Sequence, residues 1–256
     1  MSSGSANRFL RVLGTGASFI LFGAGAVCLG TVLYPVLALL PGGPLARETR
    51  MQRAIHLSFR LFVAFMRGVG VITVSVRDGG RLGRPGQGLV VANHPTLIDY
   101  VLLVSLMPQA DCVAKKAIWS NPITRGVVRG AGYISNDAGE AMVDACTRRL
   151  QEGRTVLIFP EGTRSPSRGL GRFQRGAAHV AIQSGVPLLP VTIHCEPPGL
   201  MRDQKWYEVP ERRMAFRIEV GTPITAETHG QHRGIASRAI TDELREHFAK
   251  RLGIGC

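Results

Sequence analysis

A histidine and an aspartate five positions apart, His94 and Asp99, are residue types that could do acid–base chemistry together. They follow the apolar run 88–92, and such a run ending in polar residues is typical of a buried parallel strand that delivers side chains to a sheet edge. A helix is expected at 97–107 with Thr96 as its N-cap, which puts Asp99 in the first helical turn. A carboxylate there can hold one imidazole nitrogen and leave the other free to accept a proton. The competing interpretation is a histidine that caps a turn near a surface aspartate.

A second apolar run, 155–159, also ends abruptly in polar residues. Pro160 stops the strand ladder, Gly162 lets backbone approach a ligand closely, and Arg164 offers a planar fork for a phosphate or carboxylate. The alternative is a solvated basic loop in which Glu161 and Arg164 form a surface ion pair of little energetic value. Two strands that end in such corners indicate one shared cleft instead. The basic residues that continue this stretch are Arg168, Arg172 and Arg175.

These residues resemble the motifs of the glycerolipid acyltransferases, typified by 1-acylglycerol-3-phosphate acyltransferase. His94 with Asp99 resembles the H-x4-D signature of that family, and residues 159–165 resemble its F-P-E-G-T-R-S block. Three further blocks follow in the family's order, at 173–178, 186–191 and 220–224. The resemblance covers about residues 72–224 and implies acyl transfer from a thioester donor. It also implies that the acceptor's headgroup is bound by Glu161, Gly162, Thr163 and Arg164.

One block departs from the family's pattern. Where the family has G-x-x-F-I-x-R, residues 130–136 end in Asn136, and in the family that arginine is thought to help hold the acceptor's phosphate. A neutral amide cannot replace a charge-assisted bidentate contact. Arg125 or Arg129 could supply the charge from nearby in the sequence. The departure bears on the identity of the acceptor and not on the chemistry.

Three other polar residues are expected to contact substrate. Asn93 directly precedes the candidate base, and Arg175 belongs to the basic stretch after the second corner. Lys115 lies one helix beyond the first corner and could meet the donor's phosphates, with a solvated lysine pair as the alternative.

The chain is strongly basic, with 31 Lys and Arg against 18 Asp and Glu and a formal net charge of +13. This imbalance predicts an anionic partner such as phospholipid headgroups, an acidic carrier protein or a phosphorylated thioester donor. Nucleic acid is the weakest candidate, because the sequence holds no nucleic-acid module and its N-terminus is apolar. The five cysteines are scattered without metal-ligand spacing, so neither a disulfide framework nor a metal site is expected.

Residues 12–46 contain no charged side chain, and this run exceeds the ~20 residues that cross a bilayer as a helix. A secretory signal peptide is the competing interpretation, because Arg8 and Arg11 precede the run. The run is too long for a signal peptide, however, and Pro35 interrupts it without a convincing cleavage site. We therefore expect a retained anchor, either a single span or a re-entrant hairpin.

A basic amphipathic helix is expected directly after the anchor, at 53–67. It could lie in the headgroup layer beside the anchor or pack on the catalytic domain as an ordinary helix. We assign residues 1–70 to membrane attachment and residues 71–256 to the catalytic domain. The positive-inside bias places the catalytic domain on the cytoplasmic side of the inner (cytoplasmic) membrane. The residues behind this orientation are Arg47, Arg50, Arg53 and Arg60.

Strand-like and helix-like runs alternate over residues 71–256. Strands are expected at 71–76, 88–92, 155–159, 188–194 and 214–220. Helices are expected at 97–107, 138–152, 174–184 and 235–252. This alternation predicts an α/β fold with a mixed, largely parallel sheet covered by helices, behind an N-terminal membrane-anchoring helical segment. The segment 196–213 is the longest expected loop and a candidate lid.

The predicted function is transfer of a fatty acyl group from acyl-coenzyme A or acyl carrier protein to a hydroxyl of a lysophospholipid or glycerol-phosphate-type acceptor, in membrane lipid synthesis. His94 would take the hydroxyl proton and return it to the departing thiolate, with no cofactor. No serine or cysteine lies in an elbow-like motif, which separates this reaction from that of a serine hydrolase. Two alternatives stay open: the same chemistry on a non-phosphate acceptor such as a lyso-aminolipid or specialised lipid, and a non-catalytic adaptor that binds anionic lipid.

Overall fold

A largely parallel sheet carries the polar corners expected from the sequence. The computed structural model describes residues 3–84, 86, 88–136, 139–167, 169–227 and 232–254, with side chains from Arg8 onward. The predictions for Arg168 and for residue 138 lie outside these residues. The described strands are β1 (Ile72–Arg77), β2 (Leu89–Ala92), β3 (Asp111–Ala114), β4 (Ile134–Ser135), β5 (Val156–Ile158), β6 (Leu188–Glu196) and β7 (Met214–Val220).

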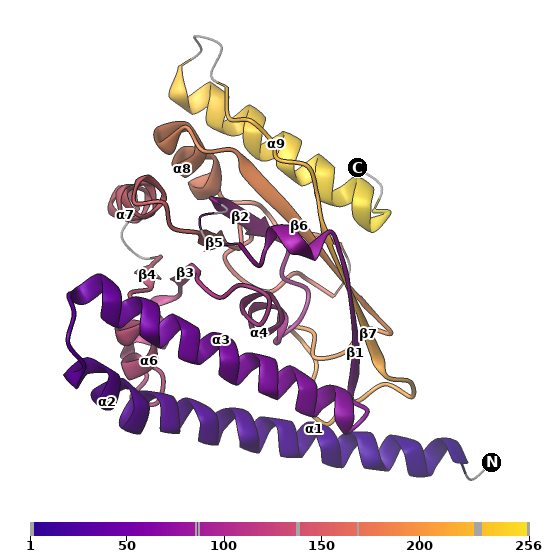
Figure 1. The fold of residues 1–256 in the computed structure, drawn as a ribbon. Helices are drawn as coiled ribbons and strands as arrows, with labels where there is room; N and C mark the ends of the chain where they lie inside the picture. The colour runs from indigo at the N-terminus through magenta and orange to yellow at the C-terminus, as the bar shows by residue number, and fades with distance from the viewer. Residues whose placement is uncertain are drawn as a thin grey trace.

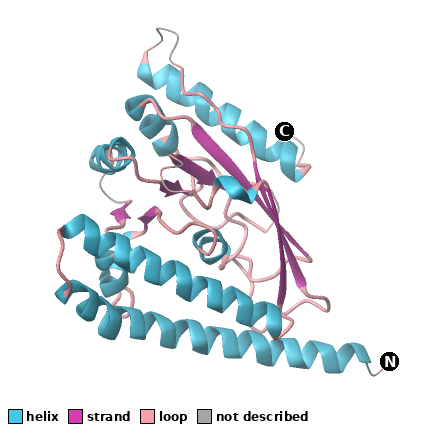
Figure 2. Ribbon diagram, in the orientation of Figure 1, coloured by secondary structure: helices cyan, strands magenta, loops and turns pink. Residues whose placement is uncertain are grey.

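These strands form one seven-stranded sheet in the order β1-β7-β6-β2-β5-β3-β4. Neighbouring strands run parallel except β6 and β7, which pair antiparallel. The mixed, largely parallel sheet predicted from the sequence is therefore confirmed, and the alternation of helices and strands is visible in Figure 2.

Helices cover both faces of this sheet (Figure 1). The predicted helices correspond to α4 (Asp99–Val104), α7 (Glu140–Gln151), α8 (Gly176–Ser184) and α9 (Arg233–Leu252). Side chains alternate along the central strands, as a period of two requires. Val90 and Leu157 pack into the core beneath α4, whereas Leu89 and Val156 pack into the core beneath α7, α8 and α9. The central strands are thus buried on both faces.

Four short elements were not predicted. Two are strands, β3 and β4, and two are helices, α5 (Lys116–Ser120) and α6 (Arg125–Gly130). Each is between two and six residues long. Segments of this length complete too few periods for hydrophobic patterning to reveal them, so their structure depends on the neighbours they pair with.

The apolar N-terminus forms helix α1 (Ser3–Cys28), which passes through a π-helical turn at Leu29–Leu33 into α2 (Tyr34–Leu39). The π turn precedes Pro35, whose missing N–H interrupts the regular hydrogen-bond ladder. Within the described residues one helix, Arg8–Leu39, is long and apolar enough to cross a membrane by length and composition alone.

Helix α3 (Pro44–Gly68) runs back beside α1 and packs on the catalytic domain (Figure 1). Met51, Ile55 and Phe59 are buried in the same core as Ile72 of the sheet. Residues 53–67 thus pack on the domain through their buried face, which is one of the two arrangements expected from the sequence. The opposite face stays exposed and carries Leu57 and Leu61 beside Arg53 and Arg60.

A buried polar network joins α3 to the sheet. The Asp111 carboxylate accepts hydrogen bonds from Arg154 Nε (2.5 Å) and Nη2 (2.9 Å) and from Gln52 Nε2 (2.8 Å). Asp111 starts β3, Arg154 directly precedes β5, and Gln52 comes from α3. All three side chains are buried, so the charges are compensated by each other and by these bonds, with weaker bonds from Gln109 to Asp111 (3.4 Å) and from Arg154 to Thr49 (3.4 Å).

Arg154→Ala should lower the free energy of unfolding by about 3–5 kcal/mol, because it leaves the Asp111 carboxylate buried without its counter-charge. Chemical denaturation of the detergent-solubilised protein measures this. Arg148→Ala removes an exposed arginine from α7 and should change stability by less than about 0.5 kcal/mol. Equal effects of the two substitutions would contradict the role of the network.

Candidate active site

The two predicted corners meet at one edge of the sheet. β2 and β5 pair in parallel with Val91 opposite Ile158, so both strands end at the same edge. The His94 N–H donates to Glu161 Oε1 (3.1 Å), and the Ser165 N–H donates to the carbonyl of His94 (2.7 Å). The two loops are therefore bonded to each other directly beside the imidazole.

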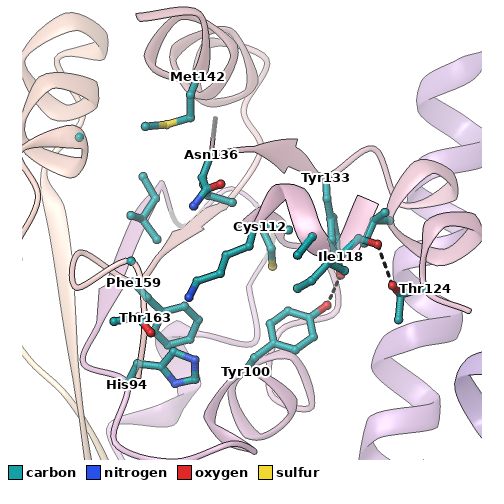
Figure 3. Close-up of a pocket in the computed structure, with 18 of the residues that line it drawn as sticks. His94, Tyr100, Cys112, Ile118, Thr124, Tyr133, Asn136, Met142, Phe159 and Thr163 are labelled. Carbon is teal, nitrogen blue, oxygen red and sulfur yellow. Dashed lines mark hydrogen bonds between the residues drawn. The ribbon is translucent and has the colours of Figure 1, made fainter. Parts of the chain in front are cut away.

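The imidazole of His94 is held by Asp99. Its Nδ1 lies 2.8 Å from Asp99 Oδ2, and the carboxylate also accepts hydrogen bonds from the N–H (2.6 Å) and hydroxyl (2.5 Å) of Thr96. An ionised carboxylate only accepts, so Nδ1 carries the proton and Nε2 keeps its lone pair. Burial raises the pKa of Asp99, and the bonds from His94 and Thr96 oppose this rise. Figure 3 shows His94 at the wall of the cavity beside Phe159, whose ring stacks on the imidazole with centroids 4.4 Å apart.

Thr96 does not cap the helix, contrary to our expectation. Helix α4 begins at Asp99, and its N-cap residue, Ile98, makes no side-chain capping bond. The capping interaction is reversed: the Asp99 carboxylate reaches back to the N–H and hydroxyl of Thr96. Asp99 lies in the first helical turn, as predicted, but the helix ends at Val104 and is shorter than the expected 97–107.

Glu161 supports the histidine from the second corner. Its buried carboxylate accepts hydrogen bonds from His94 N–H, Ser165 Oγ (2.7 Å) and Gly171 N–H (2.7 Å). Its oxygens are thus engaged within the protein, and Glu161 does not line the cavity described below. This differs from the expected contact with the acceptor and from the surface ion pair with Arg164. The geometry assigns Glu161 to positioning His94.

A cavity of about 1640 Å³ opens beside the imidazole. Its apolar part extends toward α1 and α3, and its polar part is rich in cations. Figure 3 shows Asn136 and Thr163 among its lining side chains, with Tyr100 and Tyr133 on the apolar side. Lining residues of the apolar part include Phe22, Leu29, Phe59, Phe62 and Val128. Cations that line the polar part are Lys115, Arg164, Arg175, Arg202 and Arg233.

The remaining predicted residues divide into two groups. Those that line the cavity are Gly162, Thr163, Arg164, Lys115, Asn136 and Arg175. Asn93 and Arg129 do not line it. The buried amide of Asn93 instead bonds both the N–H and the carbonyl of Ile193, which ties β2 to β6. Arg129 is exposed, because α6 directs Val127 and Val128 toward the cavity and its arginines away from it.

Several lining residues were not predicted. The hydroxyl oxygens of Tyr100 and Tyr133 lie 2.6 Å apart, and the Cys112 thiol lies beside them in the apolar part. Burial, with the charge of Asp111, raises the pKa of Cys112 far above its usual value, so this group stays a thiol and is a poor nucleophile. Cys112 lies in β3 and Tyr133 directly precedes β4, two short strands that the sequence did not reveal, whereas Tyr100 lies in the predicted helix α4. Arg202 was also missed, because it lies in the irregular 196–213 segment.

Comparisons with known proteins agree with this geometry. The Acyltransferase family model matches residues 73–194. The chain is 31% identical over 123 residues to Homo sapiens 1-acyl-sn-glycerol-3-phosphate acyltransferase beta, which covers 45% of this chain and 44% of that protein. It is 31% identical over 115 residues to the 1-acyl-sn-glycerol-3-phosphate acyltransferase of Salmonella typhimurium, and this match covers 42% of this chain and 47% of that protein. The matched part spans between 30% and 60% of the length of such curated relatives.

A solved structure shares the fold. The crystal structure of the 1-acyl-sn-glycerophosphate acyltransferase PlsC from Thermotoga maritima superposes with a TM-score of 0.66 at 20% identity, covering 94% of this chain and 97% of that chain. The sheet and its helices thus share the α/β fold of that acyltransferase. Over the matched residues the chain is similar to glycerolipid acyltransferases, which confirms the resemblance seen in its sequence.

Glu161→Gln should lower kcat by about 10- to 100-fold with little change in KM. The amide nitrogen of the new side chain would face groups that donate to the Glu161 carboxylate, and this mismatch would loosen the loop that holds His94. Steady-state acyl-transfer kinetics measure this. Glu152→Gln, at an exposed position after α7, is the matched control and should behave as wild type. A rise in KM alone would instead support direct acceptor binding by Glu161.

Proposed function

We propose that this protein transfers a fatty acyl group from a thioester donor to the free hydroxyl of 1-acylglycerol-3-phosphate. The proposal is supported mainly by the position of His94. Its Nδ1 is held by Asp99, and its ring lines a cavity that has both an apolar and a cationic part. The names of the curated relatives support the same acceptor.

In the proposed reaction His94 is the general base. Its Nε2 takes the proton of the acceptor hydroxyl as that oxygen attacks the carbonyl carbon of the thioester. The tetrahedral intermediate collapses with cleavage of the C–S bond, and the imidazolium returns the proton to the departing thiolate. Asp99 stabilises the imidazolium between these two transfers through its bond to Nδ1. The products are the ester and the free thiol, so no covalent acyl-enzyme is needed.

The two parts of the cavity suit the two kinds of group in the substrates. The apolar part offers aromatic and aliphatic walls to hydrocarbon chains. The cationic part offers guanidinium and ammonium groups to phosphate. A general base contributes about 10²–10⁴-fold to such a reaction, so positioning of both substrates must supply most of the remaining acceleration.

The direct test is transfer of a labelled acyl group to lysophosphatidic acid, with separate arms for acyl-coenzyme A and acyl carrier protein as donors. We expect labelled phosphatidic acid as product. His94→Ala should lower kcat/KM by about 10²–10⁴-fold. His247→Ala, on α9 across the sheet, is the control and should retain activity.

Other outcomes point to the alternatives. If the protein transfers acyl groups only to an acceptor that lacks phosphate, the acceptor is a lyso-aminolipid or specialised lipid and not lysophosphatidic acid. If wild type transfers no acyl group and His94→Ala keeps full activity in cells, the protein is a lipid-binding adaptor and the enzymatic proposal fails.

We further propose that α1 and α3 attach the protein to the cytoplasmic face of the inner membrane. Their outward faces carry Ile20 (75% exposed), Leu61 (73%) and Leu57 (55%). Near its start α1 bonds the 196–213 segment, where Arg11 donates to the carbonyls of Pro210 and Glu211. Its far end continues into the turn that packs on α6. A helix attached to the domain along its length supports an in-plane arrangement over a separate span.

Ile20→Glu combined with Leu57→Glu should weaken binding to vesicles of phosphatidylethanolamine and phosphatidylglycerol by at least about tenfold. Burial of one such side chain is worth about 1.5–3 kcal/mol, and each 1.4 kcal/mol is tenfold. Vesicle flotation measures this. The control is Ile235→Glu, which replaces an isoleucine that is 61% exposed on α9. Unchanged flotation of the double variant would remove these faces from the membrane contact.

A further inference from the structure

Arg164 contacts the backbone directly before Arg202, and both arginines line the cationic part of the cavity. Arg164 Nη1 donates to the carbonyl of Met201 (3.0 Å) and, more weakly, to that of Leu200 (3.4 Å). Arg202 directly follows Met201, and consecutive Cα atoms are about 3.8 Å apart. The Arg164 guanidinium therefore lies close to the backbone from which the Arg202 side chain starts, and both side chains line the cavity that contains His94.

Neither arginine is neutralised by the part of the chain that the structure describes. Arg164 donates to backbone carbonyls through Nη1, which leaves Nε and Nη2 for a ligand. Arg202 is exposed and has no hydrogen-bond or ion-pair partner among the described residues. The neighbouring carboxylate of Asp203 accepts from Ser167 Oγ (3.2 Å) instead. Two adjacent cations without an acid between them favour a bound anion.

The backbone around Arg202 is held against the catalytic corner. The Leu97 N–H donates to the carbonyl of Leu200 (3.0 Å), three residues after His94. Leu200 has a φ of 55°, a left-handed conformation that a leucine adopts only when its surroundings enforce it. The Met201 N–H donates to Gln204 Oε1 (3.0 Å). Arg202 thus starts from a fixed point relative to the imidazole.

The same cavity wall includes Asn136, the neutral residue at the position of the family's arginine. The sequence suggested Arg125 or Arg129 as substitutes, but both are exposed and neither lines the cavity. The 196–213 segment, whose backbone carbonyls accept from Arg164, instead contributes the basic side chain of Arg202 to the cavity lining. It lies 66 positions from Asn136 in the sequence (202 − 136), so motif spacing could not have found it.

We propose that Arg202 binds the acceptor's phosphate together with Arg164 and supplies the positive charge that Asn136 lacks. This rests on the proposed function, and it makes Arg202 a determinant of specificity for a phosphate monoester headgroup. The phosphate would lie between the two guanidinium groups, on the side of the cavity where Leu97 and Leu200 join the loop to His94. With this arrangement the protein binds a phosphorylated acceptor although Asn136 stands at the position of the family's arginine.

The experiment compares lysophosphatidic acid with the matching monoacylglycerol, which lacks the phosphate. Arg202→Ala should raise KM for lysophosphatidic acid by about 10- to 100-fold, as expected for loss of a charged hydrogen bond, with kcat changed less than about threefold. KM for monoacylglycerol should not change. Asn136→Arg in the Arg202→Ala background should restore most of the loss, and Arg212→Ala, an exposed neighbour in the same segment, is the control.

Equilibrium binding without a donor separates this inference from the proposed function. Fluorescent lysophosphatidic acid is titrated into wild type and Arg202→Ala in detergent. Affinity that depends on Arg202 supports the phosphate site even if no acyl transfer occurs, in which case only the proposed function fails. Equal affinity of the two proteins, absence of binding to wild type, or equal losses for the phosphorylated and neutral acceptors would overturn the role of Arg202.

Discussion

The parallel pairing of β2 with β5 is the constraint on which the site depends. Because both strands are buried on two faces and run in the same direction, their polar ends must emerge at one edge. There the Glu161 carboxylate joins the two loops by accepting the N–H of His94 and two donors of its own loop. The proposed base on one loop and the proposed phosphate-binding Arg164 on the other are thereby held in loops that one buried carboxylate joins.

Buried charge recurs as a means of joining elements that are distant in the sequence. Asp111 and Arg154 connect β3 to the start of β5 and, through Gln52, to α3. This connection sets the N-terminal helices against the sheet, and those helices wall the apolar part of the cavity. The same helices therefore close the apolar part of the cavity and present apolar side chains outward. Membrane attachment and chain binding would then share one structural element, which suits substrates that come from the bilayer.

Much of the fold was predictable because its longer elements carry complete periods of hydrophobic pattern. The five strands and four helices expected over residues 71–256 are all present, with ends displaced by a few residues. The exceptions are β3, β4, α5 and α6, which are too short to show a period. Thr96 was misassigned because the polar residue before a helix usually caps it, whereas here the Asp99 carboxylate takes both Thr96 donors.

The sequence by itself determined the candidate pair and the resemblance to a family, since His94 and Asp99 are close along the chain and their contact follows from local geometry. It also determined that Asn136 departs from the family's pattern. Only the tertiary structure decided that Asn93 and Glu161 act within the protein and that Arg129 faces away from the cavity. It alone brought Arg202 to the cavity that Arg164 also lines. Burial and hydrogen-bond partners are set by residues far apart in the chain, so motif spacing does not contain them.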